Sequence, residues 1–485
     1  MASVGTRAGS MSEESPSRLL LVVLATSTLV SAMGNSMMTV VLPQIRTEFS
    51  ASLTALGWTA TAQLLAVAVC TPLCGRFCEV FGLRAVFCAS GLTFAVASSA
   101  AVFAPGMGTL IAARAVQGVG GAGLIVTASV AVVQLVPAGR RGRVLGLTAS
   151  GTAVGQASGP ALGGFVAQAA GWRAMFVVTA VLTLVVLLGS LRALPAGDPA
   201  ARGRGRRVDL AGAGMFAGGV ALSLVALTQG AQTGAADAVP LVTGLVSLLF
   251  FAGFGWRMFT AAEPFVPSTL LADKRFLAAC VLGFLGLCAF LATETLIPLL
   301  SASANDLGSG QVGLVLLPGT VAMILISGPA GRWLDRAGTR VVATTGLLVT
   351  GGSAVFLSTF AGASPVVVSL GMLGIGVGFA VTTVPAQAAA SFAVTKKGAG
   401  AGLGLFQSVY SLGGAVGAVV SPAMLAVREG TGDGWNILHP GGATHGFSDA
   451  LLLVGVPALA ALAVVPFLAR GPREGRRRVL LGAPG

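Results

Sequence analysis

The chain contains 485 residues, of which 55% are hydrophobic and only 9% are charged. Because a soluble domain carries about 25% charged residues, this composition excludes a soluble globular protein and indicates an integral membrane protein. The formal charge of +13 does not indicate a nucleic-acid-binding protein, since the sequence contains no basic patch with interleaved aromatic residues.

Apolar stretches divide the chain into candidate membrane spans, because a helix needs roughly 20 apolar residues to cross a bilayer. We expect fourteen spans; without the seventh and eighth the count would be twelve, and the two halves would still match. The expected spans are residues 19–43, 54–74, 85–104, 108–136, 144–168, 173–194, 209–229, 238–258, 276–300, 311–331, 341–361, 364–392, 399–427 and 447–469.

This map predicts an all-α integral membrane protein in which two six-helix bundles flank an inserted helix pair. The expected segments are a cytoplasmic tail (1–18), the N-terminal bundle (19–194), a cytoplasmic linker (195–208), the inserted helix pair (209–258), a second cytoplasmic linker (259–275), the C-terminal bundle (276–470) and a cytoplasmic tail (471–485).

The basic residues predict the orientation, because cytoplasmic loops of membrane proteins are rich in Lys and Arg. With the N-terminus inside, the only exceptions among 29 basic residues are Arg46, Arg114, Arg173 and Arg428. We therefore expect both termini in the cytoplasm. Arginine greatly outnumbers lysine, which favours a high-GC genome and places the protein in a bacterial cytoplasmic membrane.

A ten-residue segment occurs twice, as GRFCEVFGLR from Gly75 and as GRWLDRAGTR from Gly331. The matching positions are Gly75/Gly331, Arg76/Arg332, Glu79/Asp335, Gly82/Gly338 and Arg84/Arg340. Such a repeat indicates an internally duplicated membrane protein, which is how secondary transporters are commonly built. We expect each acid to lie near a helix N-terminus, where backbone N–H groups favour a carboxylate, and to pair with Arg84 or Arg340. Alternatively, these charges only set the topology.

The fourth and fifth spans carry further patterns. Arg114 lies about a turn and a half inside the fourth span, where an arginine costs roughly 2.5–3.5 kcal/mol on insertion scales. It therefore requires a polar network, a water-filled cavity or a proton relay, unless its side chain extends to the outer surface. The pattern in the fifth span consists of Gly146, Gly155, Gly159, Pro160, Gly163 and Gly164. Glycines four residues apart allow a neighbouring helix to approach closely, and proline bends the helix.

With these motifs the chain resembles the major facilitator superfamily along nearly its full length. Within it, the chain looks like the fourteen-span drug/proton antiporters, and most of all like the Gram-positive-type tetracycline exporters. The resemblance implies that the repeated loops latch the cytoplasmic side closed and that Arg114 takes part in proton coupling. The first loop departs from the family pattern, with Glu79 where Asp is usual, so we expect it to be the weaker latch.

The carboxylates differ from those of the tetracycline exporters, which carry acids in spans one, five and thirteen. Those positions here are Asn35, Gln156 and the pair Gly413–Gly414. The only acid clearly inside a span is Glu294, which we expect to carry the proton. Alternatively, Glu294 lies at the outer interface near Pro298 and is merely solvated.

The expected substrate cavity offers amides and hydroxyls rather than charges. Its predicted residues are Asn35, Thr39, Gln63, Gln117, Gln156, Gln387, Gln407 and Tyr410. Such a cavity suits a fairly bulky, neutral or weakly charged organic molecule.

The sequence thus predicts a secondary active transporter that exports a small organic compound, such as an antibiotic or other drug, in exchange for protons. No ATP-binding loop, nucleophile–base pair or metal motif occurs, so we expect neither an enzyme nor a bound cofactor or metal, and the proton is the coupling ion. We expect a monomer whose partners are the substrate, protons and lipid. The alternatives are a proton-coupled importer of a metabolite on the same fold, and a membrane sensor that has lost transport.

Overall fold

The computed structural model describes residues 17–51, 53–195, 209–233, 237–261, 268–305, 307, 309–395, 399–429, 435–437 and 444–468. Within these ranges the regular structure is helical and contains no strand, as the sequence predicts. The longer helices are α1 (Arg18–Ser36), α2 (Met38–Phe49), α3 (Leu53–Phe81), α4 (Leu83–Val102), α5 (Met107–Leu135), α6 (Arg141–Ala170), α7 (Trp172–Ala193), α8 (Leu210–Thr233), α9 (Ala238–Thr260), α11 (Lys274–Asn305), α12 (Ser309–Ala337), α13 (Thr339–Thr359), α14 (Pro365–Ala393), α15 (Ala399–Glu429) and α16 (His445–Ala460). The short elements are η1 (Ala138–Arg140), α10 (Ser268–Ala272) and η2 (Ala461–Phe467).

Twelve of the fourteen expected spans coincide with one helix each, whereas the first runs from α1 past Met37 into α2 and the last from α16 into η2. The apolar character of the spans differs. Within the described residues, 12 helices are long and apolar enough to cross a membrane. The two expected spans outside that set are α6, which is rich in glycine and small polar residues, and α8, whose apolar part covers only Ala211–Leu227. The count of fourteen crossings therefore stays a prediction, whereas the all-helical membrane architecture is confirmed.

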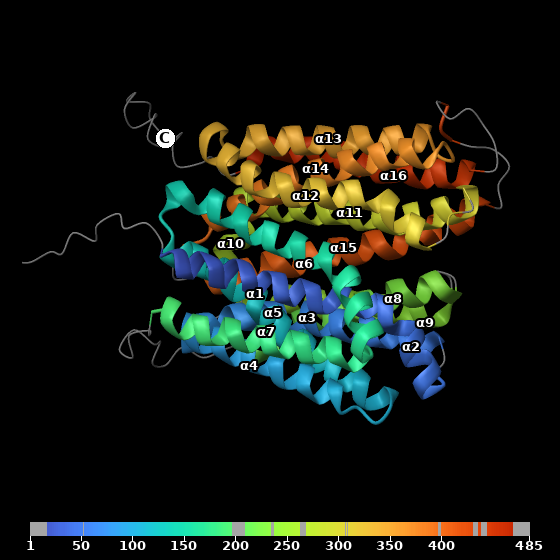
Figure 1. Ribbon diagram of the computed structural model, residues 1–485. Coiled ribbons are helices and arrows are strands. Elements are labelled where there is room, and N and C mark those ends of the chain that lie inside the picture. Colours follow the sequence, from blue (N-terminus) through green and yellow to red (C-terminus); the bar gives the residue numbers. More distant parts are fainter. Residues whose placement is uncertain are drawn as a thin grey trace, which may run out of the picture.

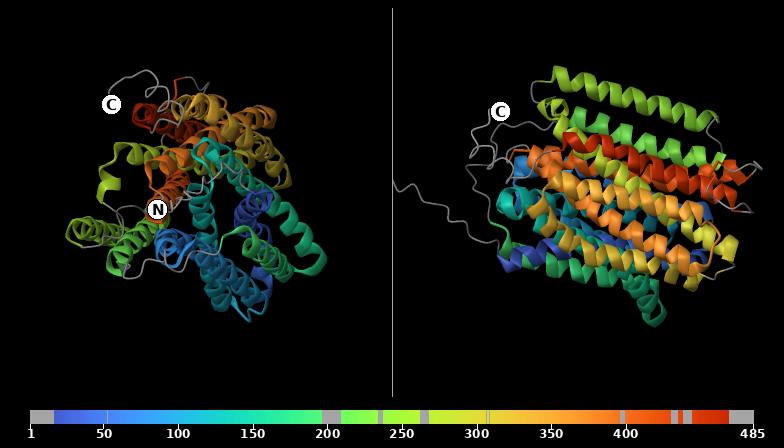
Figure 2. Two further views of the ribbon diagram at one scale, coloured as in Figure 1. Left: turned by 90° about the vertical axis from the view of Figure 1, so that its left-hand side faces the viewer. Right: turned by 90° about the horizontal axis from the view of Figure 1, so that it is seen from above.

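The helices pack as two groups that meet along two seams. In the first group α1 packs on α6, α3 and α4 on α5, and α4 on α7; in the second, α11 packs on α15, α12 and α13 on α14, and α13 on α16. Helix α6 contacts α12, and α3 contacts α15, so these pairs join the groups (Figure 1). Helices α8 and α9 pack on each other at one side of the molecule, where α8 also contacts α3 and α15 (Figure 2). Most residues of the predicted tails and linkers lie outside the described ranges, so those boundaries stay predictions.

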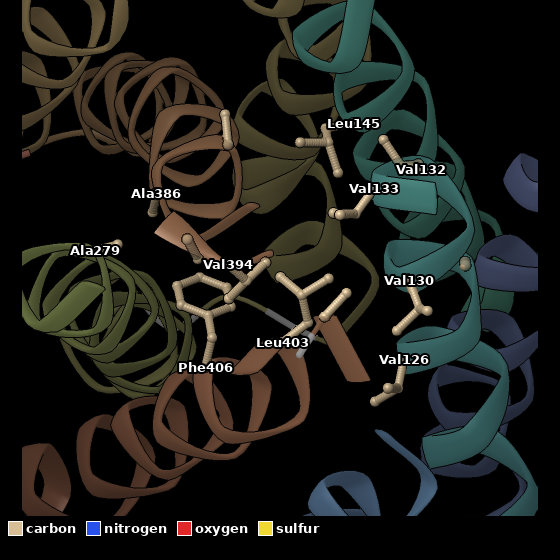
Figure 3. Packing of buried hydrophobic residues seen from close by; sticks show 14 of the residues in the cluster. Val126, Val130, Val132, Val133, Leu145, Ala279, Ala386, Val394, Leu403 and Phe406 are labelled. Carbon is tan, nitrogen blue, oxygen red and sulfur yellow. The ribbon is translucent and has the colours of Figure 1, made fainter. Parts of the chain in front are cut away.

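The long helices run between two ends of the molecule (Figure 1). We call the end at which α1 begins and η2 ends the basal end, and the opposite end the apical end (Figure 1). The largest apolar cluster lies towards the basal end and takes residues from both groups, including Val133, Leu145 and Leu403 (Figure 3). The two other clusters lie towards the apical end and belong to separate groups, except that Ala153 of α6 joins the cluster of the second group. Within the described residues, the groups therefore share their apolar core mainly near the basal end.

Candidate functional site

At the basal end the two groups touch through glycine backbones. A Cβ atom on Gly75 of α3 would lie 2.0 Å from the carbonyl oxygen of Gly400 in α15, and one on Gly400 would lie 1.8 Å from that of Gly75. In the same way, a Cβ on Gly331 of α12 would lie 2.4 Å from the carbonyl oxygen of Gly142 in α6. Each pair joins the first glycine of a repeated loop to the second residue of a helix in the other group.

The acids of the two loops bind the same helix N-termini. Glu79 Oε1 accepts a hydrogen bond of 2.9 Å from the N–H of Ala401, the third residue of α15. Asp335 Oδ2 accepts one of 3.1 Å from the N–H of Arg143, the third residue of α6. The N–H groups of a first helical turn have no partner within the helix and carry partial positive charge, which favours a carboxylate there. We call these four glycines, two acids and two helix starts the basal contact.

The arginines of the loops do not act as expected. Arg76, rather than Arg84, forms the ion pair with Glu79, and both side chains are almost completely buried. Arg84 forms no ion pair in the described part of the chain, and Arg332 is exposed. Arg340 donates to the carbonyl groups of Pro466 and Leu468 at the end of η2. The predicted pairing of Arg84 and Arg340 with the acids is therefore wrong, because Arg76 is already within reach on the same helix and Arg340 faces η2.

The second glycine of each repeated loop forms a turn between two helices. Gly82 and Gly338 have φ angles of 88° and 85° and immediately precede α4 and α13. A side chain is strained at such angles, so glycine lets the chain turn tightly between two adjacent helices.

The glycine pattern of the predicted fifth span forms the contact between α6 and α1. A Cβ on Gly155 would lie 2.3 Å from the Leu29 carbonyl oxygen, and one on Gly159 would lie 1.8 Å from Ser36 Oγ. Gly163 faces Met37, where the backbone turns between α1 and α2. Gly146 instead faces the Ser327 carbonyl oxygen of α12, so it extends the seam at the basal contact. Gly164 is half-buried, and the Pro160 side chain lies outside the described residues.

Arg114 is completely buried in α5 and does not extend to the surface. Its Nη1 donates to the carbonyl oxygen of Gly34, at 3.1 Å, and to Oε1 of Gln117. The Gln117 amide in turn donates to Ser98 Oγ of α4 at 2.8 Å. The Arg114 Nε and Nη2 atoms have no hydrogen-bond partner in the described part of the chain. Arg114 therefore lies in a polar network that joins α1, α4 and α5, close to the break between α1 and α2.

Glu294 and Asp449 both lie within expected spans. Glu294 of α11 is half-buried, and no hydrogen bond or ion pair to it occurs among the described residues. Asp449 of α16 is completely buried and ion-paired with Arg428. Asp449 is the third residue of its expected span, so the expectation that Glu294 is the only acid clearly inside a span stays a prediction. Of the two acids, Glu294 is the one that is free to exchange a proton without breaking an ion pair.

The predicted cavity residues are spread over the molecule. Gln387 lines a small hollow of about 10 Å³ towards the basal end, together with Ser129, Leu145, Ser391, Leu403 and Phe406. Gln63 and Gln117 are buried, Asn35, Gln407 and Tyr410 are half-buried, and Gln156 is exposed on α6. The Thr39 side chain lies outside the described residues. The Gln63 Oε1 atom is buried without a hydrogen-bond partner in the described part of the chain.

Sequence reasoning missed the helix-side partners of the repeated loops. Gly142 and Gly400 follow the first glycine of their own group's loop by 67 and 69 residues. A comparison of the two halves could have shown that each repeated loop is followed by a further glycine at nearly the same separation. Sequence reasoning also missed Ser98, because nothing about its position in the sequence shows that its hydroxyl accepts a hydrogen bond from Gln117.

The sequence pattern of the Major Facilitator Superfamily matches residues 24–418 and 282–482. Since the match covers most of the length, the chain belongs to this superfamily of membrane transporters. A solved structure of the human organic anion transporter MFSD10 superposes with a TM-score of 0.69 at 16% identity, covering 93% of this chain and 100% of that one, which supports the fold alone.

Three bacterial relatives carry functional names. The cephamycin export protein CmcT of Amycolatopsis lactamdurans is 30% identical, over 96% of this chain and 95% of the relative. The tetracenomycin C resistance and export protein of Streptomyces glaucescens is 26% identical, over 84% and 76%. The riboflavin transporter RibZ of Clostridioides difficile is 23% identical, over 74% and 78%. Drug and antibiotic exporters therefore occur among the relatives, together with a transporter named for a vitamin.

Proposed function

We propose that the protein exports a small organic compound, an antibiotic or other drug, in exchange for protons by alternating access. The basal end would then be cytoplasmic, in agreement with the distribution of basic residues. The observation that carries the proposal is the basal contact, in which each group lays its repeated loop on a helix N-terminus of the other. Towards the apical end the groups keep almost separate cores, as a state closed to the cytoplasm and open to the outside requires.

The proposed proton carrier is Glu294. A proton carrier has to be ionised in one state and protonated in the other, so a carboxyl without a fixed cationic partner suits the task. Arg114 and Gln117 form the fixed polar network of the opposite group, next to the break at which α1 meets α2. We infer that this network senses the position of α1 while Glu294 takes up and releases the proton.

The proposed substrate follows from the polar groups of the two bundles. Spans one, five and thirteen contribute amides or glycine where tetracycline exporters have acids, so no fixed anion there attracts a cation. The exporters among the relatives support an antibiotic-like compound with a large apolar surface. A neutral or weakly charged molecule fits this combination best.

Export can be tested in an efflux-deficient bacterial host that accumulates labelled compounds. We expect lower accumulation of one class among tetracyclines, aromatic polyketides, β-lactams and lipophilic dyes, and a protonophore should abolish the difference. Glu294→Gln should remove proton-driven export, since the amide cannot carry a proton. Asp237→Asn, at the exposed start of α9, is the matched control and should export normally. Undiminished export by Glu294→Gln would rule out Glu294 as the carrier.

The riboflavin transporter among the relatives favours a second candidate, an importer of a metabolite on the same fold. Proton-driven uptake of a vitamin-like compound by cells that contain the protein, with no change in drug accumulation, would establish that function. A sensor without transport is the third candidate, and unchanged substrate flux in Glu294→Gln and Arg114→Ala, with signalling intact, would favour it.

A further inference from the structure

The internal duplication extends to the helices around the small hollow at the basal end. Helices α5 and α14 both contain 29 residues, and α14 begins 258 residues after α5. The glycines at the second positions of α6 and α15 have the same separation. By this separation Ser129 corresponds to Gln387 and Leu145 to Leu403, and these four residues line the hollow. Leu145 and Leu403 reach it from opposite groups (Figure 3), so the hollow lies between equivalent parts of the two groups.

One arginine binds equivalent carbonyl groups of both helices next to this hollow. Arg141 is the first residue of α6, and its side chain is half-buried. Its Nη2 donates to the Val133 carbonyl oxygen of α5 at 2.7 Å, and its Nη1 donates to the Ser391 carbonyl oxygen of α14 at 3.4 Å. Val133 and Ser391 are again 258 residues apart. A single guanidinium therefore joins the two groups through corresponding carbonyl groups in the last turns of α5 and α14.

The cation itself is not duplicated. The residue of α15 that corresponds to Arg141 is Ala399, which is completely buried. Two helix C-termini, each with partial negative charge, therefore share one cation. No ion pair of Arg141 occurs in the described part of the chain, so backbone carbonyl groups balance its charge there.

The three hydrogen bonds of Arg141 respond differently to a separation of the two groups. Its Nη2 and Nε bind the carbonyl oxygens of Val133 and Val136, which belong to the same group as Arg141. The Ser391 carbonyl belongs to the other group and would move away with α14. Arg141 would then stay in place with an unoccupied Nη1 donor. Because Ser391 also lines the hollow, this donor would border the space that opens between the groups.

A free guanidinium donor prefers a carboxylate to a neutral oxygen, because charge-assisted hydrogen bonds are roughly twice as strong as neutral ones. We propose that Arg141 exchanges the Ser391 carbonyl for an acidic group of the exported compound when the basal end opens. The compound is then an organic acid, with one carboxylate or phenolate on a large apolar body. Its binding favours the open basal end, since the donor is free only in that state. This inference rests on the proposed function, which leaves the sign of a weak charge open.

The first test needs no compound. Spin labels on keto amino acids at the exposed positions 85 of α4 and 341 of α13 report the basal distance between the groups. Arg141→Gln weakens the link between the groups, so the fraction of molecules with a long distance should rise roughly 2–10-fold. Arg140→Gln removes an equal charge from the neighbouring exposed residue and is the control, which should leave the fraction unchanged. An unchanged fraction in folded Arg141→Gln would overturn the proposal.

The second test varies the charge of a probe on one apolar body. The protein in phosphatidylcholine nanodiscs is titrated with 1-pyrenebutyrate, with its neutral amide and with a pyrenebutyl trimethylammonium cation, and the same basal distance is measured. We expect the acid to lengthen the distance at about tenfold lower concentration than the amide, and the cation to act least. Arg141→Gln should remove this preference, and Arg141→Lys, which keeps the charge, should retain part of it. No response to the acid, an equal response to acid and amide, or a preference that survives in Arg141→Gln would overturn the proposal.

Two further comparisons separate the inference from its alternatives. Nanodiscs with phosphatidylglycerol offer a lipid phosphate without any probe. An Arg141-dependent lengthening by this lipid, to which the acid adds nothing, would assign the donor to lipid and overturn the proposal. An Arg141-dependent response to the acid without proton-driven export would contradict the proposed function and leave the acid site standing. Export of neutral or cationic compounds that Arg141→Gln does not alter would support the proposed function and remove the acid site.

Discussion

The two copies of the repeated loop use the same chemistry in different surroundings. Glu79 and its partner Arg76 have side chains only 3% and 4% exposed, and the carboxylate binds both Arg76 and the start of α15. Asp335 is half-buried, and its hydrogen bond to the start of α6 lies in an exposed position. Sequence comparison ranks the second copy as the better match, whereas burial ranks the first as the stronger contact. Coulombic attraction grows as water is excluded, so the surroundings outweigh the fit to a pattern.

The sharpest way to break the basal contact is to add one methyl group. A Cβ on Gly400 would lie 1.8 Å from the Gly75 carbonyl oxygen, so Gly400→Ala should disfavour the closed state. Overpacking costs about 1–3 kcal/mol, which lowers the closed population by roughly 5–150-fold. The measurement is the distance between spin labels at the exposed positions 85 of α4 and 341 of α13, which lie at the basal ends of the two groups. Gly255→Ala, on a helix face with open space around it, is the control and should leave the distance unchanged.

Removing one negative charge from each loop compares the copies directly. Glu79→Gln leaves the buried Arg76 without its counter-charge and weakens the bond to Ala401, at a cost of about 1.5–3 kcal/mol in the closed state. Asp335→Asn should cost less than about 1 kcal/mol, because water solvates that position. The fraction of molecules that keep the short basal distance, measured in both variants, gives the two costs. An equal or larger effect of Asp335→Asn would reverse the ranking of the copies.

The smallest effect is expected at an acid that water reaches freely. Glu48 is 41% exposed and binds Arg173 of α7 at 2.6 Å, and Trp172 Nε1 donates to its other oxygen. The Trp172 and Arg173 hydrogen bonds lower the pKa of Glu48 below its usual 4.5. Its ionised form therefore stabilises the fold above the usual pKa, and this stabilisation disappears as the pH falls through the lowered value. The melting temperature of Glu48→Gln should lie slightly below that of the parent at pH 7 and approach it only below about pH 4.5. A difference that grows on acidification would contradict the sign of the shift.

The sequence predicted the helices well because its apolar runs match the length of a membrane span. It also placed Glu79 and Asp335 at helix N-termini, since a short loop between two helices brings an acid close to such an end. It could not tell which helix each acid would meet, because α15 and α6 come close only through the packing of the two groups. The preference of Glu79 for Arg76 over Arg84 was equally out of reach, as both arginines are near it in sequence.

Two other results depended on the three-dimensional structure. Asp449 stands at the start of an apolar run and looks like an interfacial residue, and only folding brings Arg428 and the segment 435–437 onto it. The predicted cavity residues share a chemical type but not a location. The direction in which each side chain points depends on how its helix packs, and the residue type does not reveal this. Gln387 thus lies at the basal hollow, whereas Gln63 and Gln117 lie in the first group. Their common role in substrate binding stays a prediction.

The glycine pairs of the basal contact have a consequence for how such a protein can evolve. Every substitution at Gly75, Gly142, Gly331 or Gly400 adds atoms where no space exists, so mutation at these four positions can only weaken the contact. Gradual adjustment of the balance between states has to come from the flanking charges, where losing or regaining one carboxylate changes the energy in small steps. A population selected for faster transport would therefore accumulate changes at the acids and arginines and keep the glycines unchanged.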